Sequence, residues 1–335
     1  MSNHHLEEIT SGGPGDFIEL SIRWNDGRTI VTLSASPTGN ATEDILITKY
    51  NAAVHAKDYE EEQVLTDQIL DAIVDAGRSL FDQLAPPPTS SDSDMPSDLH
   101  SLLFPSEHAF AFRTIDDELV LLPMDRSSSS HGEEPEAQLH VIPDTKLPTF
   151  YTKDIQVLEK LLGDGYITRV LAGGREMCSK VIDDLRTEAL QRELTCLLKI
   201  AASGHAGALR VPKLLGLVRN SDSGRIIGFL EDYIPFSDTE ELSTLREIES
   251  VSSIAIARRK KWASQLQETV DLLHEIGVTW GHAKAANVLI HRDTDDVWVA
   301  DFGAGWTKSW IDQDLNGTID GDKMALKKIL EFLEV

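Results

Sequence analysis

Hydrophobic and polar residues alternate strictly near the start of the chain. Every second position from Ile18 to Trp24 is apolar and the positions between are polar, which is typical of a strand with one buried face. The Asn-Asp-Gly sequence at 25–27 supplies turn residues before a second apolar stretch at 29–33. The two stretches predict a half-buried β-hairpin.

A helical periodicity begins after the hairpin. Apolar residues recur at helical spacing from Val64 to Phe81, and the acidic run 60–62 lies where a helix N-terminus favours negative charge. The pattern predicts one long helix of about six turns. Together with the hairpin, it defines an expected α+β domain over residues 1–85.

Residues 86–150 have the composition of a linker. A Pro-, Ser- and Asp-rich stretch opens this region, and short strands are expected at 109–113 and 119–122. The run 127–136 is rich in Ser and Glu. Because it has almost no apolar side chains to offset the entropy cost of ordering, we expect it to be disordered.

From Tyr151 onward, the pattern gives strands, a glycine-containing turn and a leucine-rich helix. A helical face then repeats over 251–276 and stops at Gly277, and two short apolar strands follow at 288–290 and 297–299. A sheet-rich half followed by a long helix and a hairpin predicts an α+β domain over 151–335.

Charge and cysteine content narrow the function classes. The chain has 31 Lys and Arg against 56 Asp and Glu, a formal charge of -25, so it repels phosphate backbones and anionic lipid surfaces. We therefore expect neither nucleic acid nor membrane as a partner. Cys178 and Cys196 lie in apolar runs, which indicates buried thiols in a reducing compartment. The first residues lack the apolar core of a signal peptide, so a cytoplasmic or nuclear protein, not a secreted one, is expected.

Two segments near the C-terminus carry the candidate chemistry. Residues 281–290, GHAKAANVLI, and residues 300–303, ADFG, resemble in order and spacing the catalytic loop and the Asp-Phe-Gly segment of protein kinases. The resemblance implies that Asn287 and Asp301 bind Mg²⁺ through the hard oxygen donors that this ion prefers. It also implies that Lys284 steadies the transferred phosphate of ATP.

Glycines further upstream resemble the glycine-rich loop of the same family. Gly163 and Gly165 open this loop, where close approach of a backbone to phosphates favours residues without a side chain. Thr168 replaces the third glycine of the family pattern. Lys180, on the strand that follows, has the place of the kinase lysine that contacts the α- and β-phosphates.

That lysine requires a glutamate on the next helix. Glu193 matches the kinase residue best, and Glu188 is the alternative. Residues 228–234, GFLEDYI, resemble the hinge whose backbone receives adenine, with Leu230 as the gatekeeper. The resemblance thus implies these nucleotide-binding residues: Gly163, Gly165, Val170, Lys180, Glu193, Leu230, Glu231 and Tyr233.

One departure from the kinase pattern concerns the chemistry itself. His282 lies five residues before Asn287, where kinases have the aspartate that orients and deprotonates the acceptor hydroxyl. An imidazole can act as a base near neutral pH, but the replacement can equally abolish transfer. The first interpretation is a phosphotransferase acting on a protein or small hydroxyl acceptor, with His282, Lys284 and Asp301 catalytic. The second is a pseudokinase that senses nucleotide or binds a protein partner.

The segment after Gly303 is shorter than the activation segment and helical platform of a full protein kinase. The resemblance therefore implies a two-lobed fold with a truncated C-lobe, the N-lobe over about 151–232 and the C-lobe over about 233–335. The arrangement resembles a group of fungal kinase-like proteins that carry an N-terminal extension. Asp322 is expected to be the buried aspartate that braces the catalytic loop.

Residues 312–320, DQDLNGTID, offer a rival interpretation as an EF-hand calcium loop. Oxygen ligands alternate along this stretch, and Gly317 suits the sharp turn. The twelfth position, however, is Lys323, a cation where a bidentate glutamate closes such a loop. We therefore interpret the aspartates as a solvated acidic loop that caps the last helix.

Overall fold

The chain divides into two compact units in the computed structural model. The first comprises Met1–Ser97 and Ser101–Glu134, and the second comprises Asp98–His100 and Pro135–Val335. The structure describes residues 4–12, 17–87, 98–125, 137–141, 146–163, 165–182, 186–236, 243–303, 305–307 and 309–335.

The first unit is a five-stranded sheet with two helices. Its elements are β1 (His4–Ser11), β2 (Phe17–Trp24), β3 (Gly27–Ser34), α1 (Thr42–Ala56), α2 (Tyr59–Leu84), β4 (Glu107–Ile115) and β5 (Glu118–Pro123). The short helix α3 (Leu99–Leu103) precedes β4. The strands follow the order β1-β2-β3-β4-β5, and within the described part of this sheet only the β3–β4 pair is parallel.

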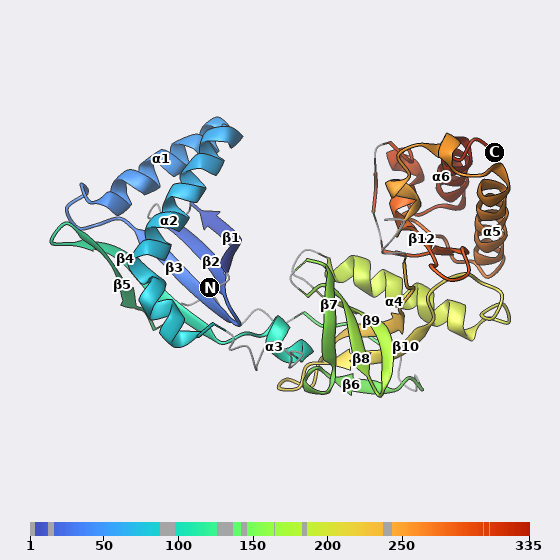
Figure 1. Cartoon of the computed structure of the whole chain (residues 1–335), viewed down its shortest axis with the longest axis horizontal. Helices are drawn as coiled ribbons and strands as arrows, with labels where there is room; N and C mark the ends of the chain where they lie inside the picture. Colours follow the sequence, from blue (N-terminus) through green and yellow to red (C-terminus); the bar gives the residue numbers. More distant parts are fainter. Residues whose placement is uncertain are drawn as a thin grey trace. The chain divides into compact units, whose positions relative to one another are not determined.

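Helices α1 and α2 lie across one face of this sheet (Figure 1). The apolar residues from Ile18 to Trp24 are fully buried, because alternate strand positions all point to the same face. Helix α2 begins after Asp58, whose side chain accepts a hydrogen bond from the backbone N–H of Glu61. The predicted hairpin and long helix are confirmed, whereas β1 and α1 were not predicted.

Strands β4 and β5 correct the expected linker over 86–150. Phe110 of β4 pairs with Val31 of β3, and both side chains are buried in the core of the first unit. An isolated two-stranded hairpin is marginal in water, so β4 and β5 gain stability by extending the sheet. The expected disordered run 127–136 lies outside the described residues.

The second unit contains a six-stranded sheet, a two-stranded hairpin and three longer helices. Its strands are β6 (Thr149–Tyr151), β7 (Gln156–Leu162), β8 (Ile167–Ala172), β9 (Arg175–Val181), β10 (Leu214–Arg219), β11 (Ile226–Asp232), β12 (Val288–Ile290) and β13 (Val297–Val299). Its helices are α4 (Thr187–Ala202), α5 (Ile256–Glu275) and α6 (Ile319–Phe332). The large sheet has the order β6-β10-β11-β9-β8-β7.

A single hydrophobic core joins the helices and the hairpin of this unit. Leu190, Leu194 and Leu197 of α4 recur at helical spacing and are buried in it. Trp262 of α5 lies in the same core and is fully buried, and Gly277, with φ of 68°, follows the end of α5. The mixed α+β class is confirmed by three sheets and six α-helices among the described residues.

None of the described helices could span a membrane. Within the described ranges, none combines the length and the apolar character that crossing a bilayer requires.

Both cysteines are free thiols, and burial raises the pKa of Cys178.

Candidate functional site

A cavity of about 830 Å³ lies in the second unit. Its walls come from the sheet strands β7, β8, β9 and β11, from α4, and from the segments that flank the β12–β13 hairpin. This volume is within the range of small-molecule sites. These predicted site residues line it: Lys180, Glu193, Glu231, Tyr233, His282, Lys284, Asn287 and Asp301.

Lys180 of β9 is held between two carboxylates. Its Nζ atom lies 2.8 Å from Oε1 of Glu193 on α4 and 2.9 Å from Oε1 of Glu231 on β11. All three residues are at most 5% exposed. Glu193 is therefore the partner of the lysine, while the alternative, Glu188, is exposed at the start of α4.

The two carboxylates keep the lysine charged despite its burial. Burial lowers the pKa of Lys180, but Glu193 and Glu231 outweigh this effect and raise it well above its usual value. Burial raises the pKa of Glu231 to about 7, against the opposing pull of Lys180. Glu193 also accepts a hydrogen bond of 3.3 Å from the backbone N–H of Phe302.

Leu230, the predicted gatekeeper, does not line the first cavity. Leu230 of β11 pairs with Ser179 of β9 and is fully buried. Its side chain lies on the face of the sheet opposite to the side chain of Lys180. Glu231 pairs with Cys178 and faces the cavity. Because side chains alternate along a strand, a slip of one position exchanges the two faces. At this part of the cavity wall the structure therefore places the carboxylate of Glu231 and not the side chain of Leu230.

The same alternation corrects Val170. It pairs with Met177 and is buried on the far face of the sheet, whereas Ile167 pairs with Lys180 and lines the cavity. Gly163 and Gly165 lie in the turn between β7 and β8 with φ of 62° and 108°, away from the lining. These glycines allow the turn, while residues next to them contribute the cavity wall.

Asp301 follows β13 and is the acceptor of several hydrogen bonds. Its Oδ2 atom accepts from Nδ1 of His282 at 2.8 Å and from Nδ2 of Asn287 at 3.1 Å, and Oδ1 accepts from the backbone N–H of Gly303 at 3.2 Å. Burial raises the pKa of Asp301, but the hydrogen bond from His282 and the charges of Lys180 and Lys284 lower it to about 2. The carboxylate is therefore ionised at neutral pH.

Lys284 completes a row of three side chains. Its Nζ atom lies 2.9 Å from Nε2 of His282. Burial lowers the pKa of Lys284, and the charge of Asp301 opposes this effect. A lysine ammonium can only donate, so we assign Nε2 of His282 as the acceptor and Nδ1 as the atom that carries the proton.

Asn287 and Asp301 suit the predicted metal role. The Nδ2 atom of Asn287 donates to the backbone carbonyl of His282 at 2.8 Å, which leaves Oδ1 of its side chain as an available ligand. One amide oxygen and one ionised carboxylate are hard donors of the kind that Mg²⁺ takes alongside phosphate oxygens and water. Across the described residues, no group of three or more His, Cys, Asp or Glu could hold a metal ion.

Arg192 is a site-supporting residue that the sequence did not reveal. From α4, its guanidinium group donates to the backbone carbonyls of Trp280, Phe302 and Gly303, and also to Thr279. It thereby connects α4, which carries Glu193, to the segment before His282 and to the segment after Asp301. A side chain at Gly281 would overlap this guanidinium group.

Asp322 holds the segment before His282 through backbone hydrogen bonds, as predicted. Its carboxylate accepts backbone N–H groups of Trp280 at 2.7 Å and Gly281 at 2.8 Å, and Nε2 of His274 lies 2.9 Å away. With 2% exposure, Asp322 satisfies two buried donors that have fixed positions. It lies in the first turn of α6, which Thr318 caps by accepting from the N–H of Gly321. The helix cap is thus a threonine rather than an aspartate of the expected acidic loop.

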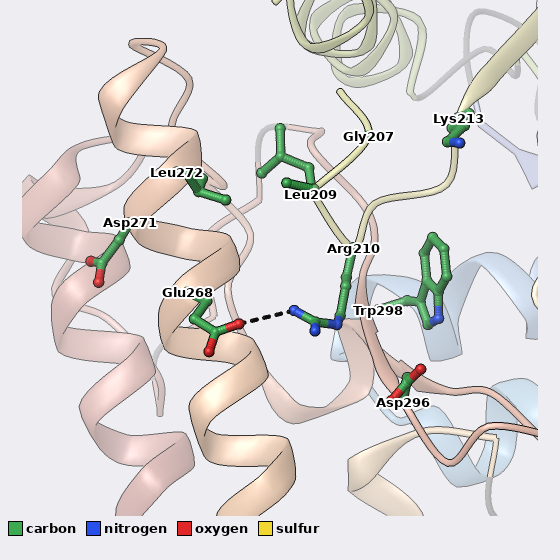
Figure 2. Close-up of a pocket in the computed structure, with 10 residues that line it drawn as sticks. Gly207, Leu209, Arg210, Lys213, Glu268, Asp271, Leu272, Asp296 and Trp298 are labelled. Carbon is green, nitrogen blue, oxygen red and sulfur yellow. Dashed lines mark hydrogen bonds and ion pairs between the residues drawn. The ribbon is translucent and has the colours of Figure 1, made fainter. Parts of the chain in front are cut away.

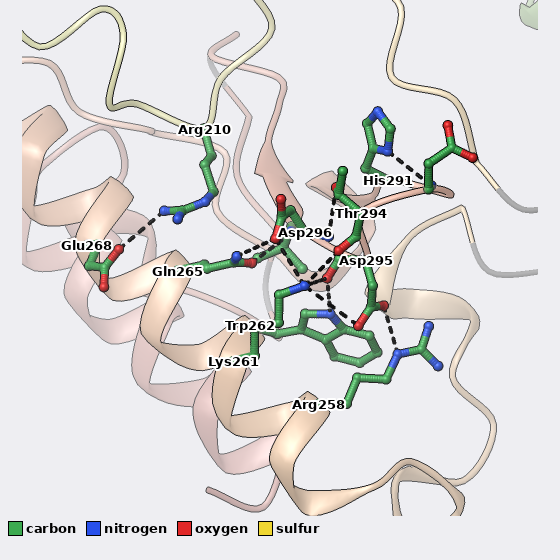
Figure 3. A network of polar contacts seen from close by, with 12 residues as sticks. Arg210, Arg258, Lys261, Trp262, Gln265, Glu268, His291, Thr294, Asp295 and Asp296 are labelled. Atoms are coloured by element: carbon green, nitrogen blue, oxygen red, sulfur yellow. Dashed lines mark hydrogen bonds and ion pairs between the residues drawn. The ribbon is translucent and has the colours of Figure 1, made fainter.

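The β12–β13 hairpin, which carries Asn287 at its start and Asp301 at its end, is fastened to α5 (Figure 3). Gln265 donates to the carboxylate of Asp296 at 2.6 Å and accepts from the backbone N–H of Val297 at 3.0 Å. Trp262 donates from its indole to the backbone carbonyl of Asp295 at 3.1 Å. These contacts fix the hairpin turn, and so the spacing of the two candidate metal ligands.

A second cavity, of about 730 Å³, is lined by different residues (Figure 2). Leu209, Leu272 and Trp298 provide its apolar surface, and Arg210 forms an ion pair with Glu268 at 3.2 Å along its edge. Its side chains do not form the lysine, amide and carboxylate combination of the first cavity. The candidate chemistry therefore lies in the first cavity.

Comparison with known proteins gives a fold-level similarity. No family model and no curated protein matches the chain. Among solved structures, it is similar to the Cydia pomonella granulovirus kinase PK-1, with a TM-score of 0.43 and 16% identity over 54% of this chain and 68% of that chain. At this identity, the similarity concerns the fold alone, and the residue assignments rest on the contacts described above.

Proposed function

We propose that the second unit is a kinase-like domain that binds ATP with Mg²⁺ in the first cavity. One observation carries this proposal: Lys180, Glu193 and Asp301, which lie far apart in the sequence, line the same cavity. Glu193 contacts Lys180 and also the backbone N–H that follows Asp301. This arrangement matches the charge pattern that a bound triphosphate and its metal require.

Each side chain has a defined role in this proposal. Lys180 offers a charged ammonium to the phosphates, and Asn287 and Asp301 would hold Mg²⁺, which neutralises phosphate charge when bound. Tyr233 lines the cavity next to the hinge strand β11, where adenine would lie. The proposal includes a truncated two-lobed arrangement over 151–335, like that of the fungal kinase-like proteins that the motifs resemble.

The pseudokinase interpretation remains a second candidate because of His282. Its two ring nitrogens contact Asp301 and Lys284, so in this conformation the imidazole is engaged within the site. Deprotonation of an acceptor hydroxyl requires a base with an accessible lone pair. Nucleotide binding without transfer to a hydroxyl acceptor is the outcome that this contact favours.

Calorimetric titration of the full chain with ATP, in the presence and absence of Mg²⁺, tests the proposal. We expect binding that Mg²⁺ strengthens, and we expect Asp301→Asn to remove the effect of Mg²⁺. The matched control is Asp312→Asn, which changes an exposed aspartate and should bind like the unmodified chain. Absence of ATP binding at millimolar nucleotide would refute the nucleotide site.

A further inference from the structure

Glu231 brings a buried carboxyl group to the wall of the first cavity. Its side chain is 4% exposed, and its Oε1 atom lies 2.9 Å from Nζ of Lys180. No described residue donates a hydrogen bond to the other oxygen, Oε2. Oε2 is also not among the described side-chain atoms that are enclosed without a partner, so it borders the open space of the cavity. Because buried polar groups are almost always hydrogen-bonded, this oxygen points to a donor on a bound molecule.

The missing partner of Oε2 must carry an N–H or O–H group. An ionised carboxylate only accepts hydrogen bonds, and the phosphate groups of a nucleotide offer acceptor oxygens. Lys180, beside Oε1, is the group that attracts those phosphates. The donor for Oε2 therefore belongs to the base or to the ribose of the nucleotide.

The neighbouring side chains favour the base over the ribose. Tyr233 lies two residues after Glu231, roughly 7 Å along an extended chain, and also lines the cavity. Ile167 of the six-stranded sheet and Leu289 of the two-stranded hairpin line it as well. A flat aromatic base can bury its faces against these side chains, whereas the hydroxyl groups of a ribose would lose their water there. Glu231 is thus placed to contact the edge of a base.

We infer that Glu231 selects the nucleobase: its Oε2 atom accepts a hydrogen bond from the 6-amino group of adenine and disfavours the 6-oxo group of guanine. This inference rests on the proposed ATP site. Adenine carries an amino donor at the position where guanine carries a carbonyl acceptor. With guanine in the same place, two acceptors would face each other without a proton between them, and the buried carboxylate would lose its water without compensation.

The ion pair with Lys180 holds the carboxyl group in place for this contact. Lys180 lies 2.9 Å from Oε1 of Glu231 and is itself fixed by Glu193 at 2.8 Å. A site rejects an analogue strongly when its own polar group is buried, since that group is then left unpaired. We therefore expect a discrimination of about tenfold or more in Kd, the size typical of a hydrogen bond to a charged group.

The test is calorimetric titration of the full chain with Mg²⁺ and three nucleotides: ATP, GTP and purine riboside 5′-triphosphate, which has hydrogen in place of the 6-amino group. The titration is done at pH 8, above the pKa of about 7 of Glu231, so that the carboxyl group is ionised. We expect ATP to bind about tenfold or more tightly than either of the others. All three carry the same triphosphate, so the ratio of their Kd values isolates the base. Equal Kd values for ATP and purine riboside triphosphate would overturn the inference.

Glu231→Met assigns the preference to this residue. It replaces the carboxyl group by a side chain of similar length, and the preference for ATP should fall about tenfold. Any change that the freed Lys180 causes in phosphate binding affects all three nucleotides alike. Glu188→Met removes the same charge from an exposed position of α4 and should keep the preference. A preference that survives Glu231→Met unchanged would overturn the inference.

Glu231→Gln decides the matter if Glu231→Met fails to fold. Its amide group can donate as well as accept, so the preference for ATP over GTP should fall, and an unchanged preference would overturn the inference.

Failure of the inference and failure of the ATP site give different results. If ATP binds but its preference over the other two nucleotides does not depend on Glu231, the inference is overturned and the proposed nucleotide site stands. If none of the three nucleotides binds the unmodified chain at millimolar concentration, both are overturned.

Discussion

Replacement of Glu231 by glutamine tests the electrostatic account of the site. Glu231 is 3% exposed and lies 2.9 Å from Lys180, which already has Glu193 at 2.8 Å. Two carboxylates thus share one ammonium in a buried place, and the second of them is costly to ionise. Glu231→Gln retains the size and a hydrogen-bonding group while it removes the charge.

The magnitude follows from the pKa of Glu231, which rises from 4.5 to about 7 on folding. At 1.36 kcal/mol per pKa unit, ionisation of Glu231 costs the folded state roughly 3 kcal/mol. Since the folded-state pKa is the higher one, the folded chain binds the proton more tightly. The associated stability is fully present below pH 4.5 and is lost as the pH rises through about 7. The variant should lack this loss and be the more stable protein at pH 8, by up to roughly 3 kcal/mol.

The assay is urea unfolding between pH 4.5 and pH 8, followed by tryptophan fluorescence. Trp24 alone of the six tryptophans lies in the first unit, so the signal reports mainly on the second. Glu188→Gln, at an exposed position of α4, is the matched control and should run parallel to the unmodified chain. Parallel profiles for Glu231→Gln and the unmodified chain would refute the reasoning.

Three further predictions concern the same site. Gly281→Ala should lower the melting temperature, because its φ is 76° and a Cβ atom would overlap Arg192; an unchanged melting temperature would exclude this close packing. Asp322→Ala should reduce the free energy of unfolding in urea by on the order of 3 kcal/mol, because two buried N–H groups lose their acceptor. A loss as small as that of the exposed control Asp312→Ala would contradict this role. Glu231→Gln should also bind ATP more tightly at pH 8 in calorimetry, since Lys180 then faces one carboxylate, and equal affinities would count against the competition.

The order of motifs in the sequence was enough to predict several residues that line the first cavity. Lys180, Asn287 and Asp301 lie in short contiguous segments whose spacing is set by local strands and turns. The cavity brings them together, as the motif order predicted. Glu193 was predicted from its resemblance to the kinase helix residue, and it lies on the buried side of α4.

Strand register could not be predicted for β11. Its residues from Ile227 to Glu231 are all buried, so hydrophobic alternation gives no sign of which face each side chain occupies. The gatekeeper position was consequently assigned to Leu230, which faces away from the cavity, although Glu231 beside it was also among the predicted nucleotide-binding residues. The role of Arg192 was missed for a different reason: its acceptors are backbone carbonyls distant in sequence, which leave no side-chain pattern.

The first unit shows the limit of local patterns as well. Strand β4 pairs in parallel with β3, and the connection between them includes α1 and α2. Parallel strands require such long crossover connections, so neighbouring residues do not reveal the pairing. The short strands were found near 109–113 and 119–122, but their place in the sheet was not.

The most direct test of the account is the melting temperature of the full chain with and without millimolar Mg²⁺–ATP, for the unmodified protein and for Lys180→Met. We predict that ATP stabilises the unmodified chain, by about 2.7 kcal/mol at a ligand concentration 100 times the Kd, and does not stabilise Lys180→Met. Lys213→Met, which changes an exposed lysine of the second cavity, should respond like the unmodified chain. Equal stabilisation of all three proteins, or of none, would contradict a nucleotide site built around Lys180.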